Sequence, residues 1–211
     1  MGRGLTVLCL LLWACGGAAA PSARGSGSLE PPDALPPSAY ASAAGRYQRA
    51  CEAGDPDGCA YLAFMHDNGF GVRADLTLAV ELSERACGEE SAYGCAYLGY
   101  LHRLGRGVPR DDVRAATLFR RACEDDELSG CVGLAIMYKS GSGVPRDLEL
   151  AAQLFRRACD QNDPLACYSL GYMYANGEGV DRDVEQAAQF FDAACESGDN
   201  VSCDAAKSLG R

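Results

Sequence analysis

Apolar and small residues recur along the chain with a period of 36 residues, in a pattern typical of α-helices. In four successive copies a cysteine is followed by Leu three positions later and by Ala or Gly four positions later, and a His or Tyr ring comes seven positions later. This spacing places the residues on one face of a helix. We call this first helix of each repeat helix A. The Leu and the Ala or Gly positions are Leu62, Ala63, Leu98, Gly99, Leu134, Ala135, Leu170 and Gly171.

A glycine loop follows helix A in every copy. Its motif is Gly-x-Gly-Val, with glycine pairs at 69 and 71, 105 and 107, 141 and 143, and 177 and 179. Glycine supplies the positive φ that a helix end and a tight reversal require. Four residues after the second glycine stands an Asp, which can cap the next helix: Asp75, Asp111, Asp147 and Asp183. A phosphate-binding loop is excluded, because no Gly-Lys-Ser/Thr follows and no strand precedes.

The second helix of each repeat, helix B, runs from this Asp to the next cysteine. Its expected buried face contains an early Ala, a larger apolar residue three positions later and an Ala before the cysteine. These residues are Ala79, Leu82, Ala86, Ala115, Leu118, Ala122, Ala151, Leu154, Ala158, Ala187, Phe190 and Ala194. The alternation of helices A and B predicts an all-α solenoid of 36-residue helix-turn-helix repeats.

Ten of the twelve cysteines form pairs separated by seven residues. Structural zinc sites place cysteines roughly two to four residues apart and need four ligands, and redox dithiols have a gap of about two residues. An even set at fixed spacing instead predicts disulfides in an oxidising compartment, each contributing about 2–3 kcal/mol through loop closure. The predicted bonds are Cys51–Cys59, Cys87–Cys95, Cys123–Cys131, Cys159–Cys167 and Cys195–Cys203.

Residues 1–14 predict an export signal, because an apolar run from Leu5 to Trp13 is too short for a permanent membrane span. Two cleavage sites are possible. Cleavage before Cys15 would give a lipoprotein acylated on that cysteine, and cleavage after Ala20 would give a secreted protein. The lipoprotein is favoured because residues 15–38 are rich in Gly, Ala, Ser and Pro, as a flexible tether would be. The repeat domain is then expected at 39–211, with repeats at 59–94, 95–130, 131–166 and 167–202 and partial caps at both ends.

The charge balance narrows the choice of partners. The chain carries 29 acidic residues against 19 Lys and Arg, a net charge of −10, which argues against a nucleic-acid partner. A membrane contact is expected only through the lipid anchor, and the chain is expected to be a monomer.

Candidate chemistry is scarce, and we predict no catalytic, cofactor-binding or metal-ligating residues. His66 and His102 share the helix A phase of Tyr138 and Tyr174, which indicates a core ring rather than a ligand. A metal site would need a third ligand on that face, and only Asp67 is adjacent. Neither Lys has a Ser three residues before it, so the Ser-x-x-Lys motif of serine β-lactamases is absent from the sequence.

The combination of Leu170-Gly-x-x-Tyr174, the Gly-x-Gly-Val loop and the following Asp resembles the Sel1-like repeat, a relative of the tetratricopeptide repeat. The seven-residue gap between paired cysteines resembles the Helicobacter cysteine-rich proteins. The resemblance covers about 41–211. It implies a right-handed α/α superhelix with helix A on the concave face, disulfide-bonded helix pairs and a role in binding proteins. Some cysteine-rich members are catalogued as β-lactamases or penicillin binders, which gives an alternative activity by resemblance alone.

The candidate partner-binding residues lie on helix A, one, five and eight positions after the cysteine. They are large rings, an aliphatic side chain and two cations: Phe64, Tyr100, Arg103, Ile136, Lys139, Tyr168 and Tyr172. Rings with a few cations are typical of surfaces that hold an extended peptide. The other interpretation is that these rings pack against neighbouring copies of helix A.

Overall fold

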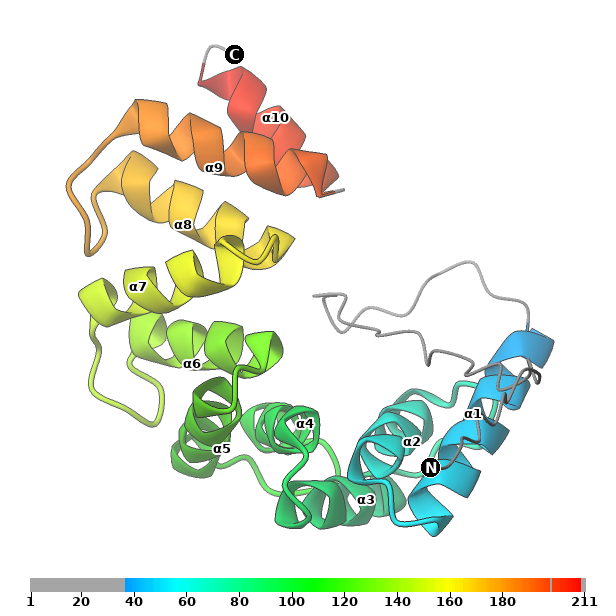
Figure 1. Cartoon of the computed structure of the whole chain (residues 1–211). Helices are drawn as coiled ribbons and strands as arrows, with labels where there is room; N and C mark the ends of the chain where they lie inside the picture. The colour runs from blue at the N-terminus through cyan, green and yellow to red at the C-terminus, as the bar shows by residue number, and fades with distance from the viewer. Residues whose placement is uncertain (1–36, 198, 210–211) are drawn as a thin grey trace, which may run out of the picture.

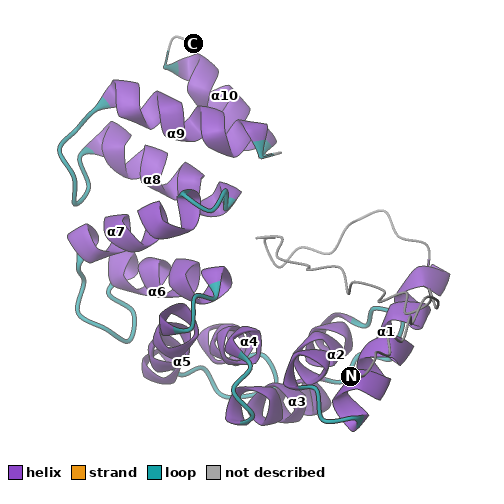
Figure 2. Ribbon diagram, viewed as in Figure 1, coloured by secondary structure: helices purple, strands orange, loops and turns teal. Residues whose placement is uncertain are grey.

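The structure, a computed structural model, describes residues 37–197 and 199–209, and this part of the chain contains ten α-helices and no strand (Figure 2). Helices α2, α4, α6 and α8 are the copies of helix A, and α3, α5, α7 and α9 are the copies of helix B. The bounds are α1 Pro37–Glu52, α2 Pro56–Asn68, α3 Leu76–Gly88, α4 Ala92–Leu104, α5 Asp112–Glu124, α6 Leu128–Ser140, α7 Leu148–Cys159, α8 Pro164–Asn176, α9 Val184–Glu196 and α10 Asn200–Ser208.

The helices form a solenoid, which confirms the predicted fold class. Each helix packs against the next one in the chain, and the stack bends into an arc with α1 at one end and α10 at the other (Figure 1). Helix α4 also packs against α2 and α6. In Figure 1, α2 and α4 lie nearer the hollow of the arc than α3 and α5. No helix in 37–197 or 199–209 is long and apolar enough to cross a membrane.

The amino-terminal predictions fall mostly outside the described residues. The export signal at 1–14, the acylation site at Cys15 and all but the last two residues of the tether lie there. Helix α1 begins at Pro37, two residues before the predicted start of the repeat domain at 39.

Capping residues explain where the helices begin and end. The predicted Asp75 side chain accepts a hydrogen bond from the backbone N–H of Leu78 at 3.0 Å, and Asp111, Asp147 and Asp183 cap their helices in the same way. The first glycine of each loop ends helix A in a left-handed conformation. At the second glycine no side chain would fit: a Cβ on Gly143 would lie 2.1 Å from the carbonyl oxygen of Asp112.

The core lies between the helices, and its alanine positions are as predicted: all eight predicted alanines of helix B are fully buried. The larger apolar position was predicted one residue too early. Leu82, Leu118, Leu154 and Phe190 are only half-buried, and the buried face instead carries Ser83, Phe119, Phe155 and Phe191.

Glycines of helix A explain this shift. A Cβ on Gly133 would lie 2.5 Å from the ring of Phe119, and one on Gly171 would lie 2.9 Å from the ring of Phe191. The missing side chains therefore leave the space that the phenylalanine rings fill, and close packing of the two helices follows.

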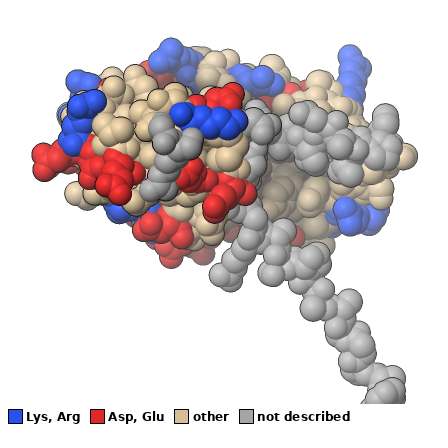
Figure 3. Space-filling model, turned by 90° about the horizontal axis from the view of Figure 1, so that it is seen from above, with Lys and Arg blue, Asp and Glu red and all other residues tan. Residues whose placement is uncertain are grey.

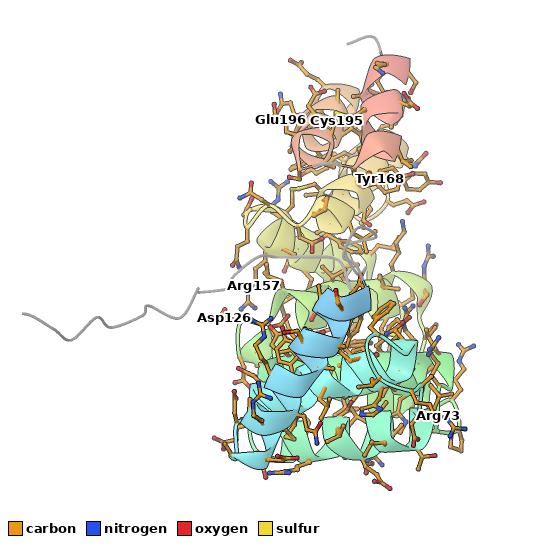
Figure 4. All side chains as sticks on the ribbon, turned by 90° about the vertical axis from the view of Figure 1, so that its right-hand side faces the viewer. Arg73, Asp126, Arg157, Tyr168, Cys195 and Glu196 are labelled. Atoms are coloured by element: carbon orange, nitrogen blue, oxygen red, sulfur yellow. A yellow bond between two sulfur atoms is a disulfide. The ribbon has the colours of Figure 1, made fainter. Side chains whose placement is uncertain are left out.

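Five disulfides join the end of one helix B to the start of the next helix A. The S–S distances are 2.00–2.06 Å, and the paired cysteines are the predicted ones. Cys51, Cys87 and Cys123 each have an arginine of the following repeat beside the sulfur, at 3.8, 3.7 and 3.5 Å. The third of these arginines, Arg157, also forms an ion pair with Asp126 (Figure 4). The arginines thus tie each of these disulfides to the next repeat.

Candidate binding surface

Most of the predicted binding residues are half-buried rather than free on the helix A face. Phe64 and Tyr100 pack against the core cluster shared by α2 and α4. Ile136 and Tyr168 pack against the cluster formed by α6, α7 and α8. Tyr172 is the exception, with 44% of its surface exposed. Packing against neighbouring helices therefore accounts for part of this set, and Tyr172 is left open to a partner.

Two predicted cations accompany the rings. The guanidinium of Arg103 lies 5.9 Å from the centre of the Tyr100 ring, and the ammonium of Lys139 lies 4.7 Å from that of Tyr172. Lys139 also forms an ion pair with Glu178 at 3.4 Å. Cations above aromatic faces are attracted by the ring quadrupole. The two tyrosines at the fifth position, Tyr100 and Tyr172, thus each have a cation beside them, which makes the face both apolar and charged.

A row of stacked tyrosines crosses the first two repeats, and the sequence pattern missed it. The ring centres are 4.9 Å apart for Tyr47 and Tyr61, 4.8 Å for Tyr61 and Tyr93, and 6.2 Å for Tyr93 and Tyr97. Tyr100 continues the row at 5.9 Å from Tyr97. Two of the rings occupy the second position after the cysteine. When the four repeats are aligned, tyrosine occupies this position only in the first two. These tyrosines are visible in the sequence, but they are not part of the 36-residue pattern that all four repeats share.

The row is anchored by a buried acid. The Tyr97 hydroxyl donates to Asp67 Oδ2 at 2.6 Å, and Arg106 Nε donates to Asp67 Oδ1 at 2.8 Å. Arg106 also donates to the backbone carbonyl of Asp67 at 3.0 Å. Burial, with the hydrogen bond to Asp67 next, raises the pKa of Tyr97, and the same acid raises the pKa of Arg106. The network joins the first repeat to the second and holds both groups in their ordinary charge states.

The two histidines lie in different surroundings. His66 Nδ1 is 3.2 Å from the carbonyl oxygen of Arg73. His102 is buried, and within the described residues neither of its ring nitrogens has a hydrogen-bond partner. Burial, and then the charge of Arg114, lowers the pKa of His102. No group of three metal-ligating side chains is present in 37–197 and 199–209.

The molecular surface is mixed in charge. Figure 3 shows acidic side chains gathered in patches on one face, with basic side chains between and above them. The basic residues of the central loops are partly neutralised by local pairs, such as Arg110 with Asp112 at 2.7 Å. A partner that meets this surface therefore encounters local charge of both signs.

The repeats match a known family. A family model for the Sel1 repeat matches residues 56–89, 92–127, 128–163 and 164–199. The chain belongs to the Sel1 repeat family. Each matched segment contains one helix A and the helix B that follows it, so the Sel1 repeats begin three residues before the predicted ones. Sel1 repeat proteins are generally scaffolds for protein–protein interaction.

Solved Sel1 repeat proteins have the same architecture. A protective antigen of uropathogenic Escherichia coli strains is 29% identical with a TM-score of 0.69, and the match covers 81% of this chain and 36% of that protein, so the chain spans about a third of its length. A Sel1 repeat protein of Oxalobacter formigenes is 22% identical with a TM-score of 0.73, over 81% of this chain and 70% of that one.

A solved cysteine-rich protein is also similar to the chain. Helicobacter pylori cysteine rich protein B is 30% identical with a TM-score of 0.50, over 62% of this chain and 94% of that protein. Among curated protein sequences no match was found. Five disulfides are typical of an extracellular or periplasmic protein.

Proposed function

We propose that the chain is an exported scaffold that binds an extended peptide or a protein segment along the helix A face of its Sel1 repeats. The observation that carries this proposal is the exposed ring of Tyr172 with Lys139 above it. Tyrosine side chains supply a large apolar contact area and a polar tip, and they are enriched where proteins bind one another.

The half-buried rings support the same proposal in another way. Phe64, Tyr100 and Ile136 are held by core contacts on one side, so little side-chain entropy remains to be lost on binding. Such a surface is pre-organised for a partner. A scaffold needs no catalytic group, and in this proposal the activity is binding alone.

The test is selection of peptides from a phage-displayed random library on the oxidised full chain. Selected peptides should bind Tyr172→Ala about fivefold to hundredfold more weakly, because one buried ring is worth about 1–3 kcal/mol of binding. Glu196→Ala, an exposed change on helix α9, is the matched control and should bind normally. Peptides that bind wild type and Tyr172→Ala equally would place the site elsewhere on the molecule.

Hydrolysis would contradict a pure scaffold. Nitrocefin turnover by a homogeneous preparation, in proportion to protein, would support the β-lactamase alternative.

A single elution peak at the mass of one chain is expected in solution, since the proposal treats the chain as a monomer.

The proposal includes attachment to a membrane through Cys15. A lipid on Cys15, with residues 16–36 as a tether, would hold the repeats near a membrane while leaving their helix A face accessible. Cys15→Ala should then release the protein from the membrane fraction or block its processing. A mature amino terminus at Pro21 would establish the secreted form instead.

A further inference from the structure

Two of the ion pairs between successive repeats share one register. The eighth residue after the helix A cysteine pairs with a residue 39 positions further along, in the glycine loop of the next repeat. Asp67 pairs with Arg106 at 2.8 Å, and Lys139 pairs with Glu178 at 3.4 Å. The earlier residue is the acid in the first pair and the base in the second. The spacing of 39 residues is therefore the same in both pairs, while the order of acid and base is reversed.

In the repeat between these two, the equivalent positions hold a base but no acid. Arg103 occupies the eighth position of the second repeat, and the residue 39 positions further along is Ser142. The Ser142 hydroxyl accepts from Ser140 at 2.8 Å. Within 37–197 and 199–209 no hydrogen bond or ion pair is formed by the Arg103 side chain, and its Nε is buried. A buried Nε–H without an acceptor is an unfavourable state that a ligand can relieve.

Nearby acids do not fill the vacancy. The pKa of Asp112 is lowered by Arg110 and, to a smaller extent, by the charge of Arg103. Both carboxylate oxygens of Asp112, however, already accept hydrogen bonds from Arg110, at 2.9 and 2.7 Å. The two carboxylate oxygens of Asp67 already accept hydrogen bonds from Tyr97 and Arg106. The ring of Tyr100 also lies beside the guanidinium, and it attracts cations without accepting a hydrogen bond in the plane of the guanidinium.

We infer that Arg103 binds a carboxylate side chain of the bound peptide. This carboxylate would pair with Arg103 as Glu178 pairs with Lys139 in the next repeat. This inference rests on the proposed peptide-binding function and adds the chemistry of the partner: an Asp or Glu flanked by an apolar residue that lies against Tyr100. Arginine suits this role because its planar guanidinium offers several donors to one carboxylate. The chain is acidic overall, so an unpaired cation on the binding face distinguishes an acidic peptide from others.

The experiment uses the same selected peptides, bound to the oxidised full chain. The enriched peptides should share an Asp or Glu, and replacing it with Asn or Gln should weaken binding about tenfold to hundredfold, because hydrogen bonds to charged groups are the stronger ones. Arg103→Gln should remove this difference between acid and amide peptides. Arg114→Gln, which removes a cation of helix α5 that pairs with Glu84, should preserve the difference.

A second variant fills the vacancy from within the chain. Ser142→Glu supplies the carboxylate at the register position of Glu178 and should weaken binding of the acid peptide about tenfold or more. Ser142→Gln has nearly the same size without the charge and should weaken it far less. Equal loss in both variants would point to steric exclusion and overturn the inference.

The outcomes separate this inference from the proposed function. Peptides that bind well in acid and amide forms alike would support the scaffold and overturn the role of Arg103. Failure to enrich any peptide would overturn both. In a third outcome, no peptide is enriched but the protein self-associates, and Arg103→Gln abolishes the self-association. The partner of Arg103 would then be a second copy of the chain, and the peptide partner would be overturned.

Discussion

The first two repeats and the last two share one backbone plan but fill the helix A face differently. In the first two, Tyr61 and Tyr97 occupy the second position after the cysteine and stand in a row of stacked rings. In the last two that position holds Gly133 and Ser169. The ring at the fifth position is half-buried as Tyr100 and exposed as Tyr172. The comparison teaches that aromatic residues at equivalent positions serve the core in one half and the surface in the other.

The largest effect is expected from removing the most deeply buried ring of the row, that of Tyr97. Tyr97→Ala should lower the free energy of unfolding by about 3–5 kcal/mol, because Tyr97 is almost fully buried and a large cavity would remain. Ser169→Ala at the equivalent position of the fourth repeat should change it by less than about 1 kcal/mol. Guanidinium titration of both variants measures the difference, and equal losses would refute the division of the molecule into two kinds of repeat.

A smaller effect is expected at the ion pairs between repeats. Asp67→Ala should cost about 2 kcal/mol, since it leaves the buried Tyr97 hydroxyl without its acceptor. Lys139→Ala breaks the partly exposed pair with Glu178 and should cost less than about 1 kcal/mol. In a Tyr97→Phe background the cost of Asp67→Ala should shrink, because the hydroxyl is already gone; an unchanged cost would show that the two residues are not coupled.

Stability should fall with acidification because of His102. Burial lowers its pKa in the folded state, while the unfolded chain binds a proton near the ordinary pKa of about 6.5. The unfolded state therefore binds more protons below that pH, so the contribution of His102 is present above it and is lost as the pH falls. His102→Tyr, which copies Tyr138, should reduce the loss of melting temperature between neutral and acidic buffer. A parallel loss in variant and wild type would assign the pH dependence to other groups.

The smallest effect on the fold is expected at Tyr172. Its exposed ring gives little to the core, so Tyr172→Ala should change the free energy of unfolding by about 0.5 kcal/mol or less. Tyr100→Ala should cost more, because this ring touches two core clusters. Thermal melting followed by circular dichroism compares the two. A large loss in Tyr172→Ala would mean that its ring supports the stack and would weaken its use as a binding residue.

The sequence predicts the fold well because every repeat states the same pattern. The cysteine spacing, the glycine loop and the capping aspartates recur without a slip, and each can be interpreted within one helix or one turn. The buried phenylalanines of helix B are different. Phe119 and Phe191 are placed by glycines of neighbouring helices, and such a relation between two helices is invisible in the period of one.

The binding surface was harder to predict for the same reason. The sequence shows that the fifth position of helix A holds large side chains, but the exposure of each one depends on the helix beside it. Tyr100 meets Tyr97 of its own helix and core residues of neighbouring ones, whereas Tyr172 remains 44% exposed. The vacancy at Arg103 appears only when residues 39 positions apart are compared, a distance that no single-helix pattern includes.

The placement of the disulfides has a consequence for how the protein is made. Each bond joins cysteines eight residues apart, and the next cysteine is 28 residues further along, as from Cys59 to Cys87. In a chain that enters an oxidising compartment from its amino terminus onward, a pair can therefore oxidise before the following pair has arrived. The correct partner is always the nearest thiol in sequence. Oxidative folding of this chain can proceed from the amino to the carboxyl end with little need for a disulfide isomerase.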